Sequence, residues 1–156
     1  MTASADRAVT VLPNRHGTAL VVGRTGLLIT GPSGSGKSEL ALRLLTSALL
    51  SGRFAGLVAD DQVLIDVRHG RVIARTPPAI AGQIEVRGSG IVRVPHLTAC
   101  VLHLALAPGE ASGADRIPAE GERCELEGGI SLPVLRMRYS AQRDPFATLE
   151  FILGSL

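Results

Sequence analysis

Short apolar runs separated by turn-forming residues fill most of this chain, and one longer run has the spacing of a helix. Val9–Leu12 and Thr18–Val22 flank a predicted turn at 13–17, and a second turn at Gly23–Thr25 leads into the apolar run Gly26–Thr30. This pattern predicts a β-hairpin that feeds a further buried strand. Glu39–Leu50 then changes to helical spacing. Its predicted buried face consists of Leu40, Leu44, Leu45 and Leu49.

The remainder of the chain is again dominated by predicted strands and hairpins. Ser51-Gly52-Arg53 closes the helix, with Gly52 as a left-handed cap. Phe54–Ala59, Gln62–Val67, Arg71–Ala74, the segment 83–95, Ala99–Ala107, Arg123–Glu127 and Ile130–Arg136 are the predicted strands. Two prolines make 76–82 a loop, and 108–121 is a loop rich in small residues. Asp144 and Pro145 start a short terminal helix, Phe146–Leu153, which Gly154 closes.

Length and composition favour one α/β domain over residues 1–156, with residues 1–8 as a frayed start. The 156 residues are 46% hydrophobic, which is enough for one proper core but too short for two comfortable domains. Aromatic residues make up only 3% and tryptophan is absent, so the core must consist of Val, Leu, Ile and Ala. The expected fold class is therefore α/β, with a hairpin-rich mixed sheet, one central helix and a short C-terminal helix.

The charge pattern and the two cysteines exclude several classes of protein. The net charge is +2, no run of Lys or Arg exists, and aromatic residues that could stack on bases are scarce, so nucleic-acid binding is disfavoured. No apolar stretch approaches the roughly 20 residues that span a bilayer. Cys100 and Cys124 have no metal-binding spacing and are expected to be small core residues. The N-terminus lacks a basic start followed by an apolar run, so we expect a cytoplasmic protein.

The strongest chemical signal is a complete phosphate-binding P-loop between the predicted strand 26–30 and the predicted helix. Its residues are Gly31, Pro32, Ser33, Gly34, Ser35, Gly36, Lys37 and Ser38. The glycines let backbone N–H groups surround a polyphosphate, Lys37 would reach the β and γ phosphates, and Ser38 would ligate Mg²⁺. The alternative is an ordinary Gly/Ser turn in a chain with 18 glycines. Lys37 is the only lysine among 16 Lys and Arg residues, which favours a specific need for a compact ammonium group.

Asp60 and Asp61 follow the buried strand that comes after the P-loop unit. A carboxylate in that place resembles the Walker B acid, which lies beside the phosphates at the end of a strand. One aspartate would orient Mg²⁺ or its water, and the other would take a proton from an attacking hydroxyl. The alternative is a surface Asp-Asp turn that leads into the next strand.

Glu85 and Arg87 alternate onto one face of the segment 83–95, opposite the apolar face formed by Ile84, Val86 and the residues from Ile91 onward. The glycines at 88 and 90 break the strand where a ligand or another backbone would approach closely. Two interpretations remain open from the residues alone. One is an exposed Glu-Arg pair before a bulge. The other is a second metal-binding carboxylate with an arginine that stabilises transferred charge.

The residues thus predict a Mg-nucleotide phosphotransfer site without naming the acceptor. No Asn-Lys-x-Asp motif that reads guanine exists, because Asn14 and Lys37 are the only residues of their kinds, so a GTPase is disfavoured. His16 lies in a predicted polar turn and is either solvated or functional. His69 and His103 are expected to be a solvated turn residue and a core or edge residue, outside the site.

Several of these motifs together resemble one family, the HPr kinase/phosphorylase catalytic domain. The resemblance covers about residues 9–95. It rests on the runs His16-Gly17-Thr18, Gly31-Pro32-Ser33-Gly34-Ser35-Gly36-Lys37-Ser38-Glu39-Leu40-Ala41-Leu42, Leu57-Val58-Ala59-Asp60-Asp61 and Gln83-Ile84-Glu85-Val86-Arg87-Gly88-Ser89-Gly90-Ile91. The last run is far more specific than a P-loop.

The resemblance implies a P-loop fold related to phosphoenolpyruvate carboxykinase, ATP or pyrophosphate as donor with Mg²⁺, and an HPr-like phosphocarrier as partner. It implies that Ser38 and Glu85 ligate the metal and that Asp60 is the general base on the acceptor serine, with Asp61 supporting the metal and its water. In reverse, inorganic phosphate would attack phosphoserine and give pyrophosphate. His16 would lie near the transferred phosphate and Arg87 would belong to the site. Asp115-Arg116-Ile117 is similar to an element of the family whose arginine assists transfer.

The chain also departs from longer members of the family. The separate N-terminal domain of those members is absent, as in the short alphaproteobacterial forms, whose partner belongs to a nitrogen-related phosphotransfer chain. Val134–Leu156 shows neither the Pro-Gly-Arg-Asn segment nor the long docking helix. These departures bear on substrate docking, on the phosphorylase reaction and on the hexamer that members often form. The alternatives are a P-loop kinase of a small-molecule acceptor and a nucleotide-binding regulator without turnover.

Overall fold

A computed structural model describes residues 12–109, 121–138 and 144–154. Its strands are β1 (Asn14–Val22), β2 (Thr25–Ile29), β3 (Ala55–Arg68), β4 (Arg71–Arg75), β5 (Gln83–Val86), β6 (Gly90–Arg93), β7 (Ala99–Leu102), β8 (Leu104–Pro108), β9 (Arg123–Glu125) and β10 (Ser131–Met137). Its helices are α1 (Lys37–Leu50), a short 3-10 turn (Pro78–Ile80) and α2 (Pro145–Leu153).

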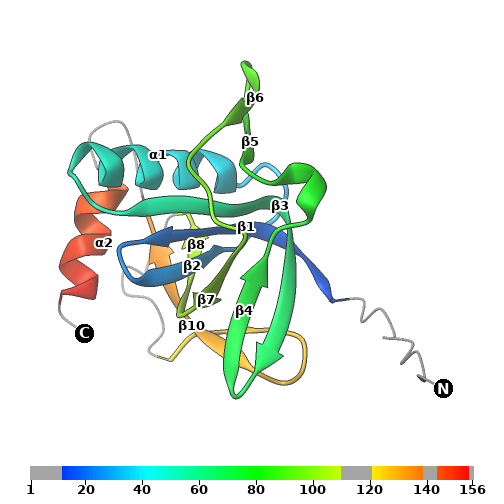
Figure 1. The fold of residues 1–156 in the computed structure, drawn as a ribbon. Helices are drawn as coiled ribbons and strands as arrows, with labels where there is room; N and C mark the ends of the chain where they lie inside the picture. The colour runs from blue at the N-terminus through cyan, green and yellow to red at the C-terminus, as the bar shows by residue number, and fades with distance from the viewer. Residues whose placement is uncertain (1–11, 110–120, 139–143, 155–156) are drawn as a thin grey trace.

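One mixed sheet carries the two α-helices on one of its sides (Figure 1). The strand order is β7-β4-β3-β1-β2-β8-β10-β9, and β5 and β6 form a separate hairpin that projects beyond the sheet (Figure 1). The pairs β2–β8 and β8–β10 are parallel, and the other neighbours are antiparallel. The predicted α/β class, with a hairpin-rich mixed sheet and a short C-terminal helix, is confirmed.

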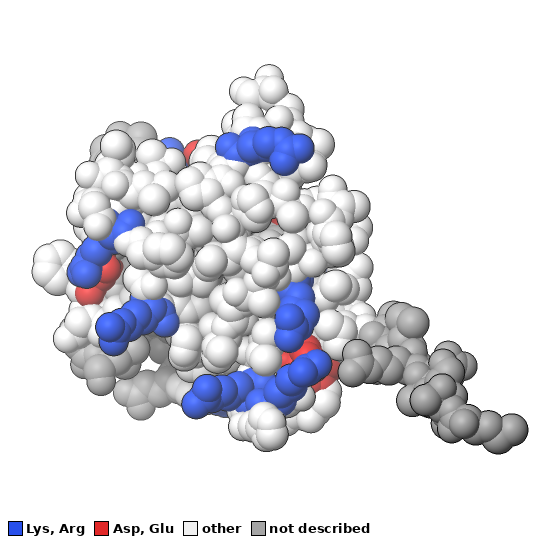
Figure 2. Space-filling view, in the orientation of Figure 1, with Lys and Arg blue, Asp and Glu red and all other residues white. Residues whose placement is uncertain are grey.

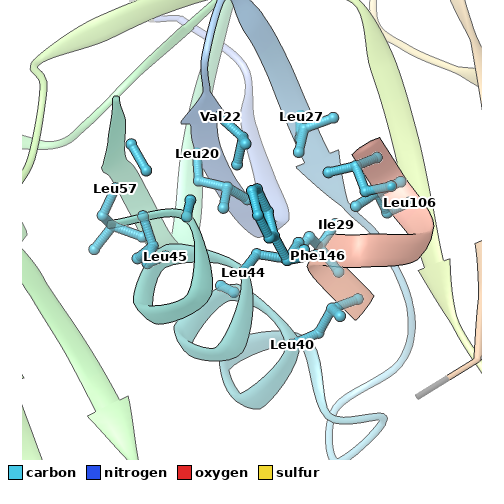
Figure 3. Close-up of a cluster of buried hydrophobic side chains, with 14 of the residues drawn as sticks. Leu20, Val22, Leu27, Ile29, Leu40, Leu44, Leu45, Leu57, Leu106 and Phe146 are labelled. Carbon is cyan, nitrogen blue, oxygen red and sulfur yellow. The ribbon is translucent and has the colours of Figure 1, made fainter. Parts of the chain in front are cut away.

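The core between the sheet and the helices is built from leucines of α1 against aliphatic strand residues. Figure 3 shows Leu40, Leu44 and Leu45 pointing toward the strands, with Phe146 of α2 closing the cluster. The prediction that Leu49 shares this face is wrong, because its side chain is 42% exposed. Ala48 is fully buried instead, since it lies one helical turn after Leu44.

A second core fills the other face of the sheet, which curls so that its β7 edge returns to β2. The predicted single strand 99–107 is wrong, because His103 divides it into β7 beside β4 and β8 beside β2. Two hydrogen bonds fix this crossing: the His103 backbone N–H donates to the Gly26 carbonyl at 2.8 Å, and the Gly26 N–H donates to His103 Nδ1 at 2.9 Å. The strand pattern alone could not reveal a crossing that depends on this long-range contact.

The largest error of the sequence prediction concerns β1 and β3. The predicted turn at 13–17 is strand from Asn14 onward, and β3 runs without a break through Asp60-Asp61. The two segments pair with each other: Gly17 lies opposite Asp61 and Thr18 opposite Asp60. Pairing to a long partner supplies backbone hydrogen bonds that override the local turn preference of these residues. The aspartates therefore lie within a strand rather than after its end.

The other turn and cap predictions inside the described residues are confirmed. His69 and Gly70 form the β3–β4 turn with φ values of 52° and 73°, and Gly128-Gly129 connects β9 to β10. Asp144 caps α2 by accepting a hydrogen bond from the Phe146 N–H at 3.0 Å. The predicted segment Val9–Leu12 and the predicted loop 108–121 lie mostly outside the described residues.

Both cysteines are free, as expected, and neither is fully exposed. Cys124 belongs to the second core, and Cys100 packs partly buried against it. Burial raises the pKa of the Cys100 thiol to about 12, which makes it a poor nucleophile. Within the described residues, neither helix has the length and apolar character needed to cross a membrane.

The crossing at Gly26 gives a test of the fold. A Cβ on Gly26 would lie 1.8 Å from the Val101 carbonyl oxygen. Gly26→Ala is therefore expected to lower the free energy of unfolding by about 1–3 kcal/mol or more in urea titrations. Gly56→Ala is the matched control, because its Cβ would meet nothing closer than 3.5 Å and alanine lowers the entropy of the unfolded chain. Equal midpoints and slopes for the two variants would contradict the close approach of β7 to β2.

Candidate active site

A cavity of about 480 Å³ lies between the P-loop, β1, β3 and the β5–β6 hairpin. It brings together ten of the residues that the sequence predicted for the site. These are His16, Ser33, Gly34, Gly36, Lys37, Ser38, Asp60, Asp61, Glu85 and Arg87. Arg116, which was also predicted, lies outside the described residues. Residues from four separate parts of the chain thus converge on one cavity.

The P-loop connects β2 to α1, as the sequence predicted. Gly34 and Gly36 have φ values of 79° and 91°, a region that glycine enters without strain. At Gly31, with φ of 143°, a Cβ would lie 2.6 Å from Ser35 Oγ. Gly31 therefore has no room for a side chain, and Gly34 and Gly36 adopt backbone conformations that favour glycine.

Lys37 is 7% exposed, and its ammonium group is held over the loop. Nζ donates to the carbonyl oxygens of Gly31 at 3.0 Å and Pro32 at 2.9 Å. An ammonium has three hydrogens, so one remains for an anion at the loop. The first N–H groups of α1 also have no partner within the helix and carry its positive dipole end.

One buried polar atom in the loop lacks a partner. Ser35 Oγ has no hydrogen bond, and it is alone in this among the buried side-chain N and O atoms of the described residues. A buried hydroxyl without a hydrogen-bond partner destabilises the protein, so a ligand with polar atoms at this place would be favourable. Phosphate oxygens against the loop would supply one. The residues present therefore fit a polyphosphate.

Asp60 is the most connected side chain of the site. It is 7% exposed and accepts hydrogen bonds from Thr18 Oγ1 at 2.8 Å and from Ser38 Oγ at 2.8 Å, both to Oδ1. The Glu85 backbone N–H donates to Oδ2 at 3.2 Å. These donors offset the cost of burying a carboxylate. They also fix its position directly beside the hydroxyl that was predicted to ligate Mg²⁺.

Asp61 has the opposite environment although it is the next residue. Its side chain is 70% exposed, and His16 Nδ1 lies 3.1 Å from Oδ1. The backbone of Asp61 has φ of 71°, which is unusual for a residue other than glycine. His16 lies in β1 rather than in the predicted turn, and this strand places its imidazole on Asp61. The pair lines the open side of the cavity.

The β5–β6 hairpin contributes Glu85 and Arg87, which project onto the cavity as the sequence predicted. An Arg87 guanidinium nitrogen lies 3.8 Å from the position that a Cβ on Gly34 would take, so the guanidinium lies against the P-loop. The expectation that Ile91 faces inward is wrong, since it is 69% exposed in β6. A Cβ on Gly88 or Gly90 would meet nothing within 4 Å, so no close approach explains these glycines; their φ values of 82° and 98° serve the hairpin turn.

Sequence reasoning missed the role of Thr18. Its side chain is fully buried, and its hydroxyl holds Asp60 from the neighbouring strand. His16 and Thr18 are two residues apart in β1 and therefore face the same side of the strand. That alternation was the available signal, and the predicted turn at 13–17 concealed it.

The described residues contain no group of three or more His, Cys, Asp or Glu side chains that could hold a metal ion. A site of that kind is not needed for Mg²⁺ beside a polyphosphate, because this ion keeps waters and binds one or two protein oxygens together with phosphate oxygens. The hydroxyl of Ser38 and the carboxylate of Glu85 are oxygen ligands of the right type at the edge of the cavity.

Comparison with known proteins shows the family to which the chain belongs. The model of the family described as "HPr Serine kinase C-terminal domain" matches residues 8–99, more than half of the 156 residues. A solved structure, the Hpr(Ser) kinase/phosphatase from Coxiella burnetii, matches with a TM-score of 0.73 over 92% of this chain and 89% of that chain. At 24% identity this likeness shows the fold.

Curated relatives carry the name HPr kinase/phosphorylase. The protein from Azoarcus sp. (strain BH72) is 35% identical over 152 residues, covering 90% of this chain and 46% of the relative. That from Chromobacterium violaceum is 34% identical, covering 94% of this chain and 50% of the relative. A protein from Clostridium tetani is 46% identical over 82 residues, or 25% of its length. The chain thus spans half or less of these relatives, and it belongs to the family of the HPr serine kinase C-terminal domain.

Proposed function

We propose that this protein is an ATP-dependent serine kinase whose acceptor is HPr or an HPr-like phosphocarrier, and that it also catalyses the reverse reaction with inorganic phosphate. The observation that carries the proposal is the bond from Ser38 Oγ to the buried Asp60, inside a cavity that also holds the exposed Asp61. The Asp60 carboxylate contacts Ser38, the P-loop residue that is proposed to ligate Mg²⁺. The Asp61 carboxylate is exposed and therefore accessible to an acceptor. The names of the relatives supply the acceptor and the reverse reaction.

The loop would hold the phosphates through its backbone N–H groups, Lys37 and Ser35 Oγ. Mg²⁺, when bound through Ser38 and Glu85, would neutralise charge on the phosphate oxygens. The Ser38 hydroxyl can give a lone pair to a metal while it still donates its hydrogen to Asp60 Oδ1, at the 2.8 Å distance observed. Ser38 and Asp60 therefore do not need to separate when Mg²⁺ binds.

The contacts favour a division of roles between the aspartates that differs from the sequence prediction. The resemblance assigned the general base to Asp60, but both of its oxygens already accept hydrogen bonds in a site that is 7% exposed. Asp61 has an open carboxylate and a positioning partner in His16. We therefore assign to Asp61 the proton transfer with the acceptor serine, and to Asp60 the alignment of Ser38 and the metal.

The forward step transfers the γ-phosphoryl group of ATP to the serine of the carrier. The serine Oγ of the carrier forms a bond to the γ-phosphorus, the bond from that phosphorus to the bridging oxygen of ADP breaks, and the serine proton passes to Asp61. In reverse, an oxygen of inorganic phosphate forms a bond to the phosphorus of phosphoserine, and the bond from that phosphorus to the serine Oγ breaks. Asp61 takes the proton of the attacking phosphate and gives a proton to the serine Oγ. The products are pyrophosphate and the free serine.

Arg87 would stabilise the charge that develops on the transferred group, because its guanidinium lies against the P-loop and no described residue pairs with it. Arg116 is proposed for a similar role from the family resemblance alone. Action on a phosphocarrier with cellular ATP implies a cytoplasmic site of action. Assembly into a homo-oligomer, a hexamer by family resemblance, and the extent of the chain as a single domain stay predictions.

The proposed activity is tested by incubating the purified chain with Mg²⁺, γ-labelled ATP and the HPr-like proteins of its organism, and mapping label by mass spectrometry. The expected result is label on a carrier serine, removed on addition of inorganic phosphate with release of pyrophosphate. Nucleotide binding without label on any carrier would overturn the proposal. It would indicate either a kinase of a small-molecule acceptor or a regulator without turnover.

The division of roles between the aspartates predicts different effects for two isosteric variants. Asp61→Asn should lower the single-turnover rate of serine phosphorylation about 10²–10⁴-fold while leaving Mg-ATP affinity nearly unchanged, because it removes a proton acceptor. Asp60→Asn should weaken Mg-ATP binding, because it disturbs the group that aligns Ser38. The measurements are rapid-quench kinetics and calorimetric titration. Loss of affinity in Asp61→Asn with normal affinity in Asp60→Asn would contradict this assignment.

Thr18 is predicted to position Asp60 rather than to contact substrate. Thr18→Val keeps the volume but removes the donor that lies 2.8 Å from Asp60 Oδ1. The Mg-ATP affinity should therefore fall severalfold, and the free energy of unfolding should fall by about 1–2 kcal/mol. Thr18→Ser retains the hydroxyl and serves as the control. It should restore most of the Mg-ATP affinity although it also lacks the methyl group. If serine and valine variants bind Mg-ATP equally weakly, the hydroxyl has no positioning role.

A further inference from the structure

A second cavity, of about 630 Å³, lies at the other end of the sheet from the P-loop. Its lining comes from the β1–β2 and β3–β4 turns, from β7 with His103, and from the start of β10. Gly26 at the start of β2 lines this cavity, whereas the P-loop follows the end of the same strand. The volume is in the range of small-molecule sites. The proposed phosphotransfer site does not use this cavity.

The charged lining of this second cavity is entirely basic. Arg24 and Arg71 contribute to it, and no Asp or Glu does. Arg24 lies in the β1–β2 turn, and Arg71 is the first residue of β4, directly after the β3–β4 turn. Antiparallel strand pairing fixes the backbone at both places, so ordering these side chains around a ligand costs less entropy than it would on flexible loops.

The arginines without a partner are not scattered at random over the described residues. Most described arginines donate to acidic side chains or carbonyl oxygens, as Arg53 does to Glu150 and Arg68 to Asp66. In Figure 2 some basic groups touch acidic ones, while others stand among uncharged side chains. Within the described residues, no hydrogen bond or ion pair involves the side chain of Arg24, Arg71, Arg87 or Arg93.

Most of these four arginines lie at concave sites of the protein. Arg87 lines the P-loop cavity, where an anionic substrate is expected, and Arg24 and Arg71 line the second cavity. Arg93 lines neither. Three of the four guanidinium groups without a protein partner thus lie at the two concave sites, and a planar guanidinium is suited to bind an oxyanion through two hydrogen bonds.

His103 adds a hydrogen-bond donor, its Nε2–H, to the second cavity. Its Nδ1 accepts the hydrogen bond from the Gly26 N–H at 2.9 Å, so the neutral ring carries its hydrogen on Nε2. The ring lines the cavity and is exposed. It therefore offers an N–H donor to a ligand in the cavity.

Most of the remaining lining is apolar, and its members Val21, Val72, Leu102 and Leu132 are buried. Ser131 adds one hydroxyl to it. An inorganic ion alone would leave this surface unused. A ligand with a carbon skeleton and an anionic group would use both parts of the cavity. Cys100 also lines it, but burial raises the pKa of its thiol to about 12, which disfavours covalent capture of a ligand.

We propose that this second cavity binds a small organic anion, whose carboxylate or phosphate group is held by Arg24, Arg71 and the His103 Nε2–H and whose carbon skeleton lies on the aliphatic floor. The inference does not rest on the proposed kinase function, because no residue of the P-loop cavity takes part in it.

The test is a residue-resolved NMR titration of the full chain with two probes, sodium sulfate and sodium succinate, each at constant ionic strength set with sodium chloride. Sulfate stands for a phosphate-like group and succinate for a carboxylate on a carbon skeleton. The expected result is saturable shifts of the Gly26, Arg71 and His103 signals with at least one probe. The stronger of the two responses identifies the class of anion. Shifts at the P-loop are recorded separately and do not count toward this site.

Single variants distinguish specific binding in the second cavity from nonspecific attraction to positive surface charge. Arg71→Gln and Arg24→Gln should each weaken probe binding about tenfold, the loss expected for a charge-assisted hydrogen bond. Arg93→Gln removes the same charge from an arginine that lines neither cavity, and it should leave binding unchanged. All three residues are exposed, so urea midpoints should agree with the unchanged chain. If one cavity variant fails to fold, the other carries the same test.

Three outcomes would overturn the proposal. One is linear shifts without saturation for both probes, which indicate adventitious association only. Another is an equal loss in Arg93→Gln and Arg71→Gln, which indicates general screening of charge. The third is shifts confined to the P-loop residues, which would leave the second cavity empty of anions while the proposed kinase function stood unaffected.

Discussion

The hydrogen bonds of Asp60 are the constraint on which the arrangement of the site depends. The carboxylate joins three separate parts of the chain, because Thr18 of β1, Ser38 of α1 and the Glu85 backbone of β5 all donate to it. Burying a charged carboxylate is costly unless donors surround it, so these contacts support one another. Through them Asp60 connects β1, the start of α1 and the hairpin that carries Glu85 and Arg87.

The path of β3 explains why two adjacent aspartates lie in different environments. Successive side chains of a strand point to opposite faces, so one of the two carboxylates turns inward to Ser38 and the other outward. The left-handed backbone at Asp61 adjusts that alternation, and His16 on the paired strand holds the outward carboxylate at the open side of the cavity. The exposure difference, 7% for the residue Asp60 against 70% for the Asp61 side chain, decides which carboxylate an acceptor serine can reach.

Much of this arrangement follows from local sequence. The P-loop, the capped helices and the glycine turns were predictable because each depends on backbone conformations that few residue types adopt, as Gly128-Gly129 and Asp144-Pro145 illustrate. The alternation of Glu85 and Arg87 onto one face was predictable from the period of a strand. The continuous β1 and β3 were not, because Asn14, Gly17 and the Asp60-Asp61 pair favour turns locally and only their mutual pairing makes them strands. The same holds for the crossing at His103, for the hydroxyl of Thr18 and for the second cavity, which all depend on contacts between residues more than forty positions apart.

The central claim is that Asp60 aligns Ser38 for the metal while Asp61 faces the acceptor, and the most direct test is a crystal structure of the chain with Mg²⁺ and a non-hydrolysable ATP analogue. The account predicts phosphate oxygens within hydrogen-bond distance of Lys37 Nζ and Ser35 Oγ, and Mg²⁺ on Ser38 Oγ with the bond from that hydroxyl to Asp60 retained. It also predicts an Asp61 carboxylate open to solvent beyond the γ-phosphate. A nucleotide bound away from the P-loop, or Asp60 turned away from Ser38 with Asp61 in its place, would contradict it.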